Sequence, residues 1–237
     1  MAVANALVVV PTYCEAESLE GVVRRLLDSD SRIDILIVDD NSPDGTGELA
    51  DRIAERTPRV TVLHRPHKSG LGKAYLAGFA EAAMRGSEYV IEIDADGSHQ
   101  PEQLPTLLDA LEAGADLAIG TRWMPGGEVH NWPLHRRLIS RAGTRYARLL
   151  LRSKLRDITS GFRGYRVSTL QRLKVDTAHS QGYCFQIELA WRVERADGEI
   201  TEFPISFIER EQGQSKMSFA IVAEAMWRVT LWGIRGR

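Results

Sequence analysis

The chain has 237 residues, of which 43% are hydrophobic and 26% charged, and its formal net charge is −2. This composition is typical of a globular protein with a sizeable core, and the near-neutral charge gives no overall reason to expect a nucleic-acid partner. No stretch reaches the roughly 18 consecutive apolar residues that a transmembrane helix needs.

The N-terminus and the cysteines both indicate a cytoplasmic protein. The first residues lack the basic and apolar regions of a secretory signal. The two cysteines, Cys14 and Cys184, lie far apart in the sequence and match no spacing typical of metal or redox sites. We therefore expect the chain to work in a reducing compartment.

The first half of the chain alternates between strands and helices. Short apolar runs rich in β-branched residues predict buried strands at 6–10, 33–38, 60–63, 89–93 and 116–120. Helical patterns fall between them, at 17–27, after residue 45 to about 56, at 70–84 and at 101–112. This alternation predicts an α/β fold: an open, Rossmann-like, mostly parallel sheet flanked by helices.

The second half departs from this alternation. We predict a helix at 135–152, a loop at 155–165, a helix at 184–195, a strand at 199–208 and a last helix at 219–234. The last helix is apolar almost all round and too short to span a bilayer, so it is either a core helix or an interfacial helix with Trp227 and Trp232 at the headgroup level. We expect residues 1–237 to form a single domain.

Basic residues concentrate between Arg122 and Arg172, a segment that contains twelve basic residues and only two acidic ones. On the predicted helix at 135–152 they form an arc about 80° wide, made of Arg137, Arg141, Arg145, Arg148 and Arg152. A separate arc is apolar and contains Leu138, Ile139, Ala142, Tyr146, Leu149 and Leu150. The arginine arc is either a solvated face or a contact with an anionic lipid surface or lipid phosphate.

Polar side chains follow several of the predicted strands at the point where each strand ends. In open parallel sheets, ligands bind beyond these carboxyl ends. Asp94 and Asp96 are the most informative pair, because alternate residues of an extended segment share one face and two carboxylates can hold a divalent cation. The alternative is an ordinary strand-to-turn junction in which aspartates only stabilise the turn.

Other common catalytic motifs are missing. The stretch from His67 to Lys73 lacks the first Gly and the Ser or Thr of a phosphate-binding P-loop, although it remains a candidate anion contact. No Gly-x-Gly-x-x-Gly follows the first strand, which disfavours a nicotinamide-dependent oxidoreductase. The six histidines show no metal-binding spacing, so we expect surface or loop positions for them.

The sequence resembles the family 2 glycosyltransferases of the GT-A fold, and among them the polyprenol (dolichol) phosphate mannose synthases. The motifs that carry the resemblance extend over nearly the whole chain, and those from Arg122 onward are specific for the branch that glycosylates lipid phosphates. They are Pro11-Thr12-Tyr13-Cys14-Glu15, Val38-Asp39-Asp40-Asn41-Ser42-Pro43-Asp44-Gly45-Thr46, Gly70-Leu71-Gly72, Asp94-Ala95-Asp96, Gly120-Thr121-Arg122, Gly126-Gly127 with Asn131-Trp132, Asp157 with Ser160-Gly161-Phe162, and Arg210 with Gly213, Ser215 and Lys216.

The resemblance implies a nucleotide-sugar half at 1–121, with a metal-bound donor. Base and ribose contacts would come from Pro11, Tyr13, Glu15, Val38 and Asp40. Asp94, Ala95 and Asp96 would meet the sugar nucleotide, with Asp94 and Asp96 holding Mg²⁺ or Mn²⁺ at its diphosphate. Relatives often place a glutamine as a further metal ligand where this chain has Ser98, so the third ligand is either Ser98 or water.

The resemblance also implies an acceptor- and membrane-facing half at 122–237. Arg122 and Arg136 would bind the acceptor's phosphate, and Arg210 and Lys216 would close over the donor diphosphate. Asp157 is a candidate catalytic residue that orients the acceptor or accepts a proton, or else it anchors its loop through Arg156 or Arg163. C-terminal membrane helices, present in some relatives, are missing from this sequence.

The implied function is inverting transfer of mannose from GDP-mannose to a polyprenyl or dolichyl phosphate at the cytoplasmic face of a membrane. The chain would attach peripherally, either directly or through a separate membrane-anchoring subunit. Two alternatives remain open. One is the same chemistry with UDP-glucose, since no single residue distinguishes guanine from uracil. The other is a non-catalytic partner-binding domain of the same fold.

Overall fold

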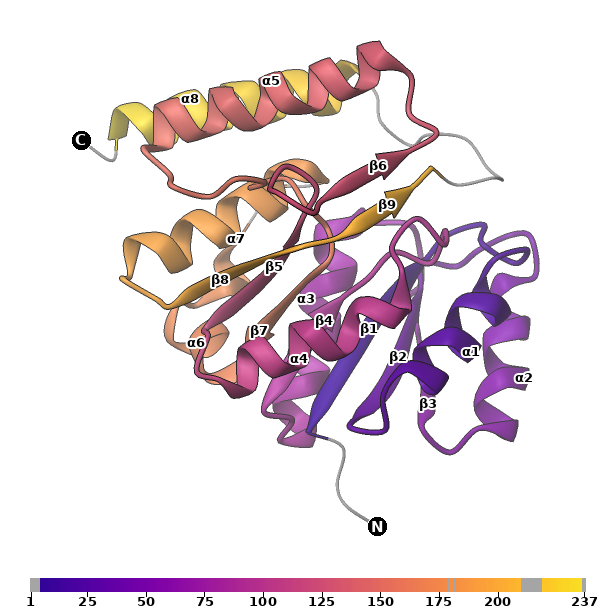
Figure 1. The fold of residues 1–237 in the computed structure, drawn as a ribbon. Helices are drawn as coiled ribbons and strands as arrows, with labels where there is room; N and C mark the ends of the chain where they lie inside the picture. The colour runs from indigo at the N-terminus through magenta and orange to yellow at the C-terminus, as the bar shows by residue number, and fades with distance from the viewer. Residues whose placement is uncertain (1–4, 179, 181, 210–218, 236–237) are drawn as a thin grey trace.

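Within residues 5–178, 180, 182–209 and 219–235, which the computed structural model describes, seven strands form one sheet in the order β3-β2-β1-β4-β7-β5-β8 (Figure 1). All neighbours pair in parallel except β7, which is antiparallel to both β4 and β5. The prediction of an open, mostly parallel α/β sheet is therefore confirmed. The strands are β1 (Ala6–Thr12), β2 (Ile33–Asp39), β3 (Val60–His64), β4 (Tyr89–Glu92), β5 (Leu117–Thr121), β7 (Arg163–Arg166) and β8 (Ile200–Pro204).

Helices cover both faces of the sheet, which explains why its strands are apolar without alternation. One core joins the sheet to α1 (Leu19–Ser29), α2 (Thr46–Arg56) and α4 (Leu104–Glu112), which follows the short η1 turn (Pro101–Gln103). The opposite core contains α3 (Leu71–Arg85), α6 (Val167–Arg172) and α7 (Tyr183–Arg195). Successive side chains of β1 point to opposite faces of the sheet, so Val8 packs in the first core and Val9 in the second.

Several elements of the second half differ from the prediction, among them β7 and the predicted strand at 199–208. Strand β7 begins within the segment predicted as a loop and extends one residue beyond it. Gly164 makes room for the side chains of α4, because a Cβ there would lie 2.5 Å from Leu107 Cδ2. The predicted strand at 199–208 is two strands, β8 and β9 (Ser206–Ile208), and β9 pairs with β6 (Glu128–His130) in a separate small sheet. Ile205 marks the change of sheet, because its N–H donates to Thr121 while its carbonyl accepts from Glu128.

A pair of long helices lies above α7 at one end of the molecule (Figure 1). They are α5 (Leu134–Leu151) and α8 (Phe219–Arg235). Gly233 lets them approach closely, since a Cβ there would lie 2.8 Å from the Leu150 carbonyl oxygen. The hydroxyls of Tyr146 and Thr230 are 2.6 Å apart across the interface. No helix in the described part of the chain combines the length and apolarity needed to cross a bilayer.

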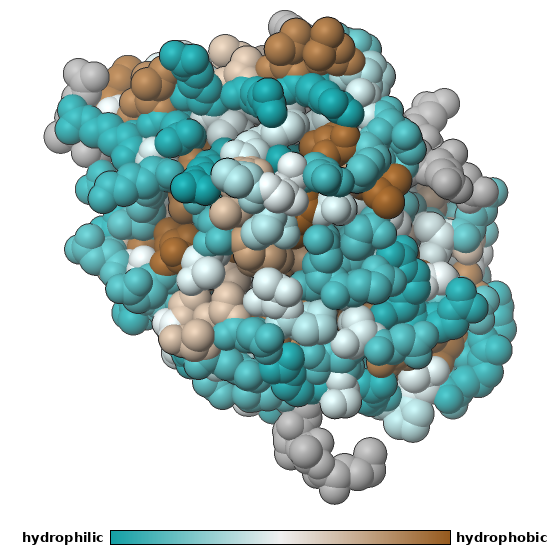
Figure 2. Space-filling view, viewed as in Figure 1, coloured by the Kyte–Doolittle hydropathy of each residue, from teal (hydrophilic) through white to brown (hydrophobic). Residues whose placement is uncertain are grey.

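The apolar arc predicted on α5 is only partly packed. Leu138, Ile139 and Leu149 are 58%, 55% and 70% exposed, whereas the buried residues of the helix are Thr144, Ala147 and Leu151. Helix α8 likewise buries Val229 but exposes Met226, Trp227 and Ile234. The space-filling view shows hydrophobic side chains over these two helices, interspersed with hydrophilic ones (Figure 2). The α5–α8 pair therefore presents an amphipathic outer surface.

Candidate functional site

The loops after β1 and β2 are tied together at the carboxyl edge of the sheet. Main-chain N–H groups of the first loop donate to side chains of the second: Cys14 to Ser42 Oγ at 3.1 Å and Glu15 to Thr46 Oγ1 at 3.0 Å. Buried Asp39 accepts from Thr12 Oγ1 at 3.0 Å and from Ser42 N at 3.0 Å. These bonds hold both loops in fixed positions beside the strand ends.

The predicted donor-binding residues gather at these loops. Pro11, Tyr13 and Glu15 are partly exposed, and the Lys68 ammonium lies 3.8 Å from the centre of the Tyr13 ring. Val38 is fully buried in the core, so only its main chain is available to a ligand. The residues therefore form an edge that combines an aromatic ring with charged side chains.

Asp40 is buried and already has protein partners. Its Oδ1 is 2.6 Å from Arg65 Nη1, and its Oδ2 accepts the Ser69 N–H at 3.1 Å. Through these contacts Asp40 fixes the segment that leads into α3. This is a positioning role that the sequence analysis did not foresee, and its predicted contact with the donor stays a prediction.

Asp94 and Asp96 lie on the turn that follows β4. Both are partly exposed, whereas Ala95 between them is buried. Asp96 Oδ1 also accepts the Ser98 N–H at 3.0 Å, across a turn in which Gly97 has φ +74°. Two outward carboxylates on a fixed turn are the hard oxygen donors that Mg²⁺ and Mn²⁺ prefer, so the residues present fit a divalent cation.

Two buried residues support Asp94 from behind. The Tyr75 hydroxyl donates to Asp94 Oδ1 at 3.4 Å, and burial raises the pKa of that hydroxyl well above its usual value, so it remains a donor. His99 Nδ1 accepts the Asp94 N–H at 3.5 Å. Burial lowers the pKa of His99 to about 4, so the ring is neutral at pH 7 and can accept that hydrogen bond.

We expect Tyr75→Phe to weaken divalent-metal binding by about 10-fold, the lower end of the effect typical for a residue that orients a metal ligand. The ring and its stacking on Phe79 would be retained, and only the donor to Asp94 would be lost. Titration of Mn²⁺ in the presence of a nucleoside diphosphate measures the effect. An unchanged Mn²⁺ affinity would show that Asp94 needs no support from Tyr75.

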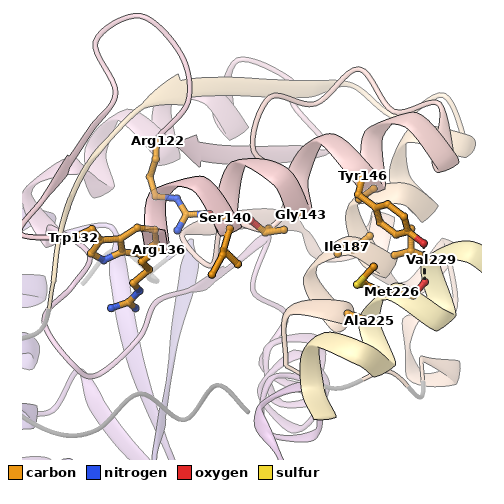
Figure 3. A pocket seen from close by; sticks show the side chains of 13 residues that line it. Arg122, Trp132, Arg136, Ser140, Gly143, Tyr146, Ile187, Ala225, Met226 and Val229 are labelled. Carbon is orange, nitrogen blue, oxygen red and sulfur yellow. Dashed lines mark hydrogen bonds between the residues drawn. The ribbon is translucent and has the colours of Figure 1, made fainter. Parts of the chain in front are cut away.

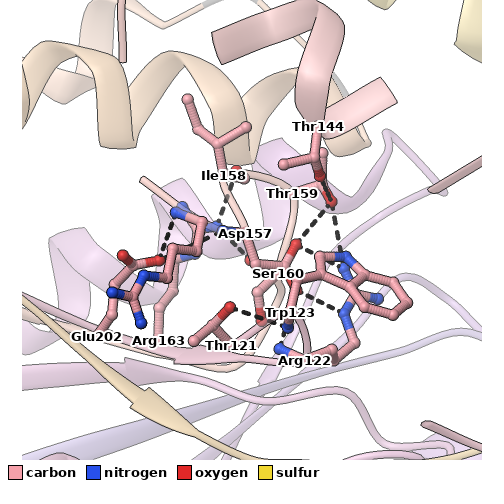
Figure 4. Close-up of polar contacts among 11 residues, drawn as sticks. Thr121, Arg122, Trp123, Thr144, Asp157, Ile158, Thr159, Ser160, Arg163 and Glu202 are labelled. Carbon is pink, nitrogen blue, oxygen red and sulfur yellow. Dashed lines mark hydrogen bonds and ion pairs between the residues drawn. The ribbon is translucent and has the colours of Figure 1, made fainter. Parts of the chain in front are cut away.

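Arg122 and Asp157 form a buried ion pair beside the end of β5 (Figure 4). Asp157 is fully buried and accepts from Arg122 Nε at 2.7 Å and Nη2 at 2.9 Å. Burial alone would raise the pKa of Asp157, but the charge and hydrogen bonds of Arg122 outweigh it and hold the pKa below its ordinary value. Asp157 does anchor its loop, but through Arg122 rather than through Arg156 or Arg163.

Arg163 holds the same loop from within the sheet. This side chain is fully buried on β7, opposite Glu92 in register, and donates to the carbonyl oxygens of Ile158 at 3.1 Å and of Ser160. It also donates to the Gln186 carbonyl of α7 at 2.8 Å. Arg163 thereby fixes the turn that carries Asp157 against the central sheet.

A cavity of about 130 Å³ opens between α5, α7 and α8 next to Arg122. Arg122, Trp132 and Arg136 gather at one end, and apolar side chains line the other (Figure 3). Arg136 pairs with Glu209 at the end of the described segment. The apolar lining includes Ile139, Ala147, Ile187, Ala225, Met226 and Val229. The cavity therefore combines a cationic end with a hydrophobic body.

Aromatic contacts connect the loop after β4 with the Arg122 guanidinium. The buried His99 ring stacks on Phe162 at 5.7 Å and meets Phe207 edge-on at 5.2 Å. Phe207 in turn lies 5.4 Å from the Arg122 guanidinium. His99 lies in the loop between β4 and η1, one of the two positions predicted for the histidines, but it is buried because these aromatic side chains enclose it.

Many of these residues could be predicted from the sequence, and others could not. The structure brings Asp94, Asp96, Arg122, Arg136 and Asp157 to one end of the sheet. Predicted Arg210 and Lys216 lie outside the described residues. Supporting residues that were missed are Tyr75, His99, Trp132 and Glu209. Of these only Trp132 lay within a motif of the resemblance, and no spacing signalled its place in a pocket.

Comparisons with known proteins identify the chain as a glycosyltransferase. Residues 7–174 match the family model described as Glycosyl transferase family 2. The chain is 51% identical over 234 residues to a protein of Mycolicibacterium smegmatis named polyprenol monophosphomannose synthase, covering 98% of this chain and 88% of that protein. It is also 51% identical over 233 residues to the undecaprenyl-phosphate mannosyltransferase of Micrococcus luteus, covering 98% and 96%. The chain therefore belongs to glycosyltransferase family 2.

Solved structures support the same fold at lower sequence similarity. The mannosyltransferase PcManGT from Pyrobaculum calidifontis, in complex with GDP-Man and Mn²⁺, is 17% identical with a TM-score of 0.67, covering 99% of this chain and 65% of that one. Glucosyl-3-phosphoglycerate synthase from Mycobacterium tuberculosis is 18% identical with a TM-score of 0.68, covering 98% and 80%. The GT-A fold expected from the sequence is confirmed.

Proposed function

We propose that the chain transfers mannose from GDP-mannose to a polyprenyl monophosphate. The cavity between α5, α7 and α8 is the observation that carries this proposal. Its end at Arg122 and Arg136 suits a phosphate, and its apolar body suits the first part of a lipid chain. The relatives named as polyprenol and undecaprenyl phosphate mannosyltransferases support the same acceptor class.

The donor would bind along the edge formed by the loops after β1, β2 and β4. Tyr13 and Glu15 are placed for contacts with the base and ribose, and Asp94 and Asp96 for the cation at the diphosphate. A bound Mg²⁺ or Mn²⁺ would neutralise charge that develops on the leaving diphosphate. Arg210 and Lys216 would close over the donor in this proposal.

The proposed chemistry is a single displacement at the sugar. An oxygen of the lipid phosphate forms a bond to C1 of mannose as the bond from C1 to the diphosphate breaks, and the electron pair leaves with GDP. The nucleophile is anionic near neutral pH, so no general base is required. Buried Asp157, with both oxygens engaged by Arg122, would position that arginine rather than accept a proton.

A transfer assay with a polyprenyl phosphate acceptor tests this proposal directly. GDP-mannose and UDP-glucose are compared as donors, each with Mg²⁺, with Mn²⁺ and with EDTA. We expect metal-dependent turnover of GDP-mannose and a product of inverted configuration at C1. Preference for UDP-glucose would identify it as the donor in place of GDP-mannose. Retention of configuration at C1 would exclude the single displacement. Turnover of neither donor would favour a non-catalytic domain.

We further propose that the α5–α8 surface attaches the protein to the cytoplasmic face of a membrane. Exposed Leu138 and Leu149 of α5 and Trp227 of α8 suit the boundary between headgroups and acyl chains. Arg145 and Arg148 are exposed on α5 and suit anionic headgroups. This surface lies beside the cavity, so a lipid acceptor could reach Arg122 without leaving the membrane.

Charge reversal on α5 is expected to weaken attachment to anionic vesicles specifically. Arg145→Glu with Arg148→Glu should lower binding to phosphatidylglycerol-containing vesicles by at least about 10-fold, since each basic residue near such a surface contributes roughly 1 kcal/mol. Leu138→Asp with Leu149→Asp should weaken binding to neutral vesicles as well. Vesicle sedimentation measures both effects.

Met84→Asp provides the matched control for this experiment. Met84 is 75% exposed near the C-terminal end of α3, away from the α5–α8 pair (Figure 1). The substitution should leave vesicle binding unchanged. Equal vesicle binding by all variants would show that the arginine arc is a solvated face. Attachment through a separate anchoring subunit would then be favoured.

A further inference from the structure

Trp132 lines the cationic end of the proposed acceptor cavity. It lies between β6 and α5, directly after Asn131, which has a positive φ of 62°. The side chain is 8% exposed and lines the cavity together with Arg122 and Arg136 (Figure 3). Phe207 packs edge-on against its ring at 5.3 Å. The ring is therefore held in a fixed orientation at the cationic end.

The indole N–H of Trp132 has no hydrogen-bond partner among the described residues, although its nitrogen is buried. Indole nitrogen is a donor only, and a buried donor without an acceptor is costly and rare. Two cations lie beside the ring: the guanidinium of Arg136 is 4.3 Å and that of Arg122 5.4 Å from the ring centre. The carboxylates that pair with these arginines do not accept from the indole, so its N–H is available to an anionic acceptor that a ligand would supply.

We propose that the indole N–H of Trp132 donates a hydrogen bond to a phosphate oxygen of the acceptor lipid, so that Trp132 is a binding residue beside Arg122 and Arg136. This inference rests on the proposed function, because it assigns a further contact to the same acceptor. The oxygen that it would hold is a non-bridging one, leaving another to attack C1 of the sugar.

The existing ion pairs explain why a neutral donor is useful here. Two nitrogens of Arg122 are engaged by Asp157, and Arg136 pairs with Glu209. An indole N–H adds a directional bond without adding positive charge. A third cation would stabilise the phosphate more strongly but would also make its oxygen a poorer nucleophile. Trp132 would thus orient the phosphate while preserving its reactivity.

Trp132→Phe tests the proposal, since it removes the N–H donor and retains an aromatic ring beside the two arginines. The phenyl ring is smaller than the indole, and the control below measures the effect of that loss of packing. We expect the KM for a short-chain polyprenyl phosphate to rise roughly 10- to 100-fold, the effect of one hydrogen bond to a charged oxygen. The KM for the nucleotide sugar should change less than twofold. Binding of the corresponding polyprenol, which has no phosphate, should be unaffected.

Trp123→Phe is the matched control. The Trp123 indole nitrogen is also buried without a described partner, and its ring also stacks with Arg122, at 5.5 Å, but Trp123 does not line the cavity. This variant should bind the polyprenyl phosphate within twofold of the wild type. Thermal unfolding of both variants would verify that each is folded at the assay temperature.

A spectroscopic signal complements the kinetics. The chain has five tryptophans, so its ¹⁵N-labelled indole groups give few resonances, and the Trp132 signal is the one absent from Trp132→Phe. Addition of the polyprenyl phosphate should move the Trp132 indole proton downfield, as expected for a new hydrogen bond to an anion. Addition of the polyprenol should not.

The outcomes separate this inference from the proposed function. A wild-type protein that neither binds nor glycosylates polyprenyl phosphate would overturn the proposed function itself. A wild-type protein that is active, with a Trp132→Phe variant of equal acceptor KM and an unmoved indole proton, would overturn the role of Trp132 alone. An equal loss of acceptor affinity in the Trp123→Phe control would assign the effect to packing around Arg122.

Discussion

The Asp96→Asn enzyme should lose at least about 1000-fold of its transfer rate, equivalent to roughly 4 kcal/mol of transition-state stabilisation. Asparagine retains the size of the side chain and an oxygen that can accept the Ser98 N–H, so the turn after β4 should persist. Only the negative charge beside the leaving diphosphate is removed. Transfer of radiolabelled mannose from GDP-mannose to a polyprenyl phosphate measures the effect.

Asp28→Asn serves as the control for charge removal. Asp28 is an exposed residue of α1. The Asp28→Asn enzyme should transfer mannose at the wild-type rate and unfold at the wild-type temperature. Mn²⁺ binding in the presence of GDP should be lost in Asp96→Asn and retained in Asp28→Asn. A fully active Asp96→Asn enzyme would exclude the metal site at Asp94 and Asp96.

The second large effect concerns stability. Asp157→Ala should lower the free energy of unfolding by about 3–5 kcal/mol, because it leaves the buried guanidinium of Arg122 without its counterion. Replacing both partners, as in Arg122→Met with Asp157→Leu, should restore much of this loss, since no uncompensated charge remains. Denaturant unfolding at pH 7 measures all three proteins.

The pH dependence gives an independent check on the same pair. The pKa of Asp157 lies below its ordinary value of 3.8, so its contribution to stability is present above pH 3.8 and is lost as the pH falls from there toward the lowered pKa. The stability difference between wild type and Asp157→Ala should therefore narrow below about pH 4. A loss of less than about 1 kcal/mol at pH 7 would contradict the role of the ion pair.

The first half of the fold could be predicted because its signals are local. Strands buried on both faces are continuous apolar runs, and β1, β2 and β4 all show them. Strand β7 gives no such signal. An arginine at position 163 suggests a surface residue, and only the structure shows the main-chain carbonyl oxygens that accept its hydrogen bonds inside the protein. Its place in the sheet depends on contacts with residues distant in sequence.

The site could be predicted as a set of residues but not as a set of interactions. Asp94 and Asp96 are recognisable by their spacing after a strand. The pairing of Arg122 with Asp157 joins positions 35 residues apart, and no periodicity relates them. The surroundings of α5 could not be predicted either, because an apolar arc in the sequence does not show whether protein or solvent lies against it.

Strand β7 also sets the order in which the chain can fold. It fills the gap between β4 and β5, yet it begins at Arg163, well after β5 has ended at Thr121. Until it arrives, β4 and β5 each present an open edge, and such edges invite pairing with other chains. The gap in the sheet can therefore be filled only after the chain has been synthesised through β7, and we expect a chain truncated after β5 to be prone to aggregation.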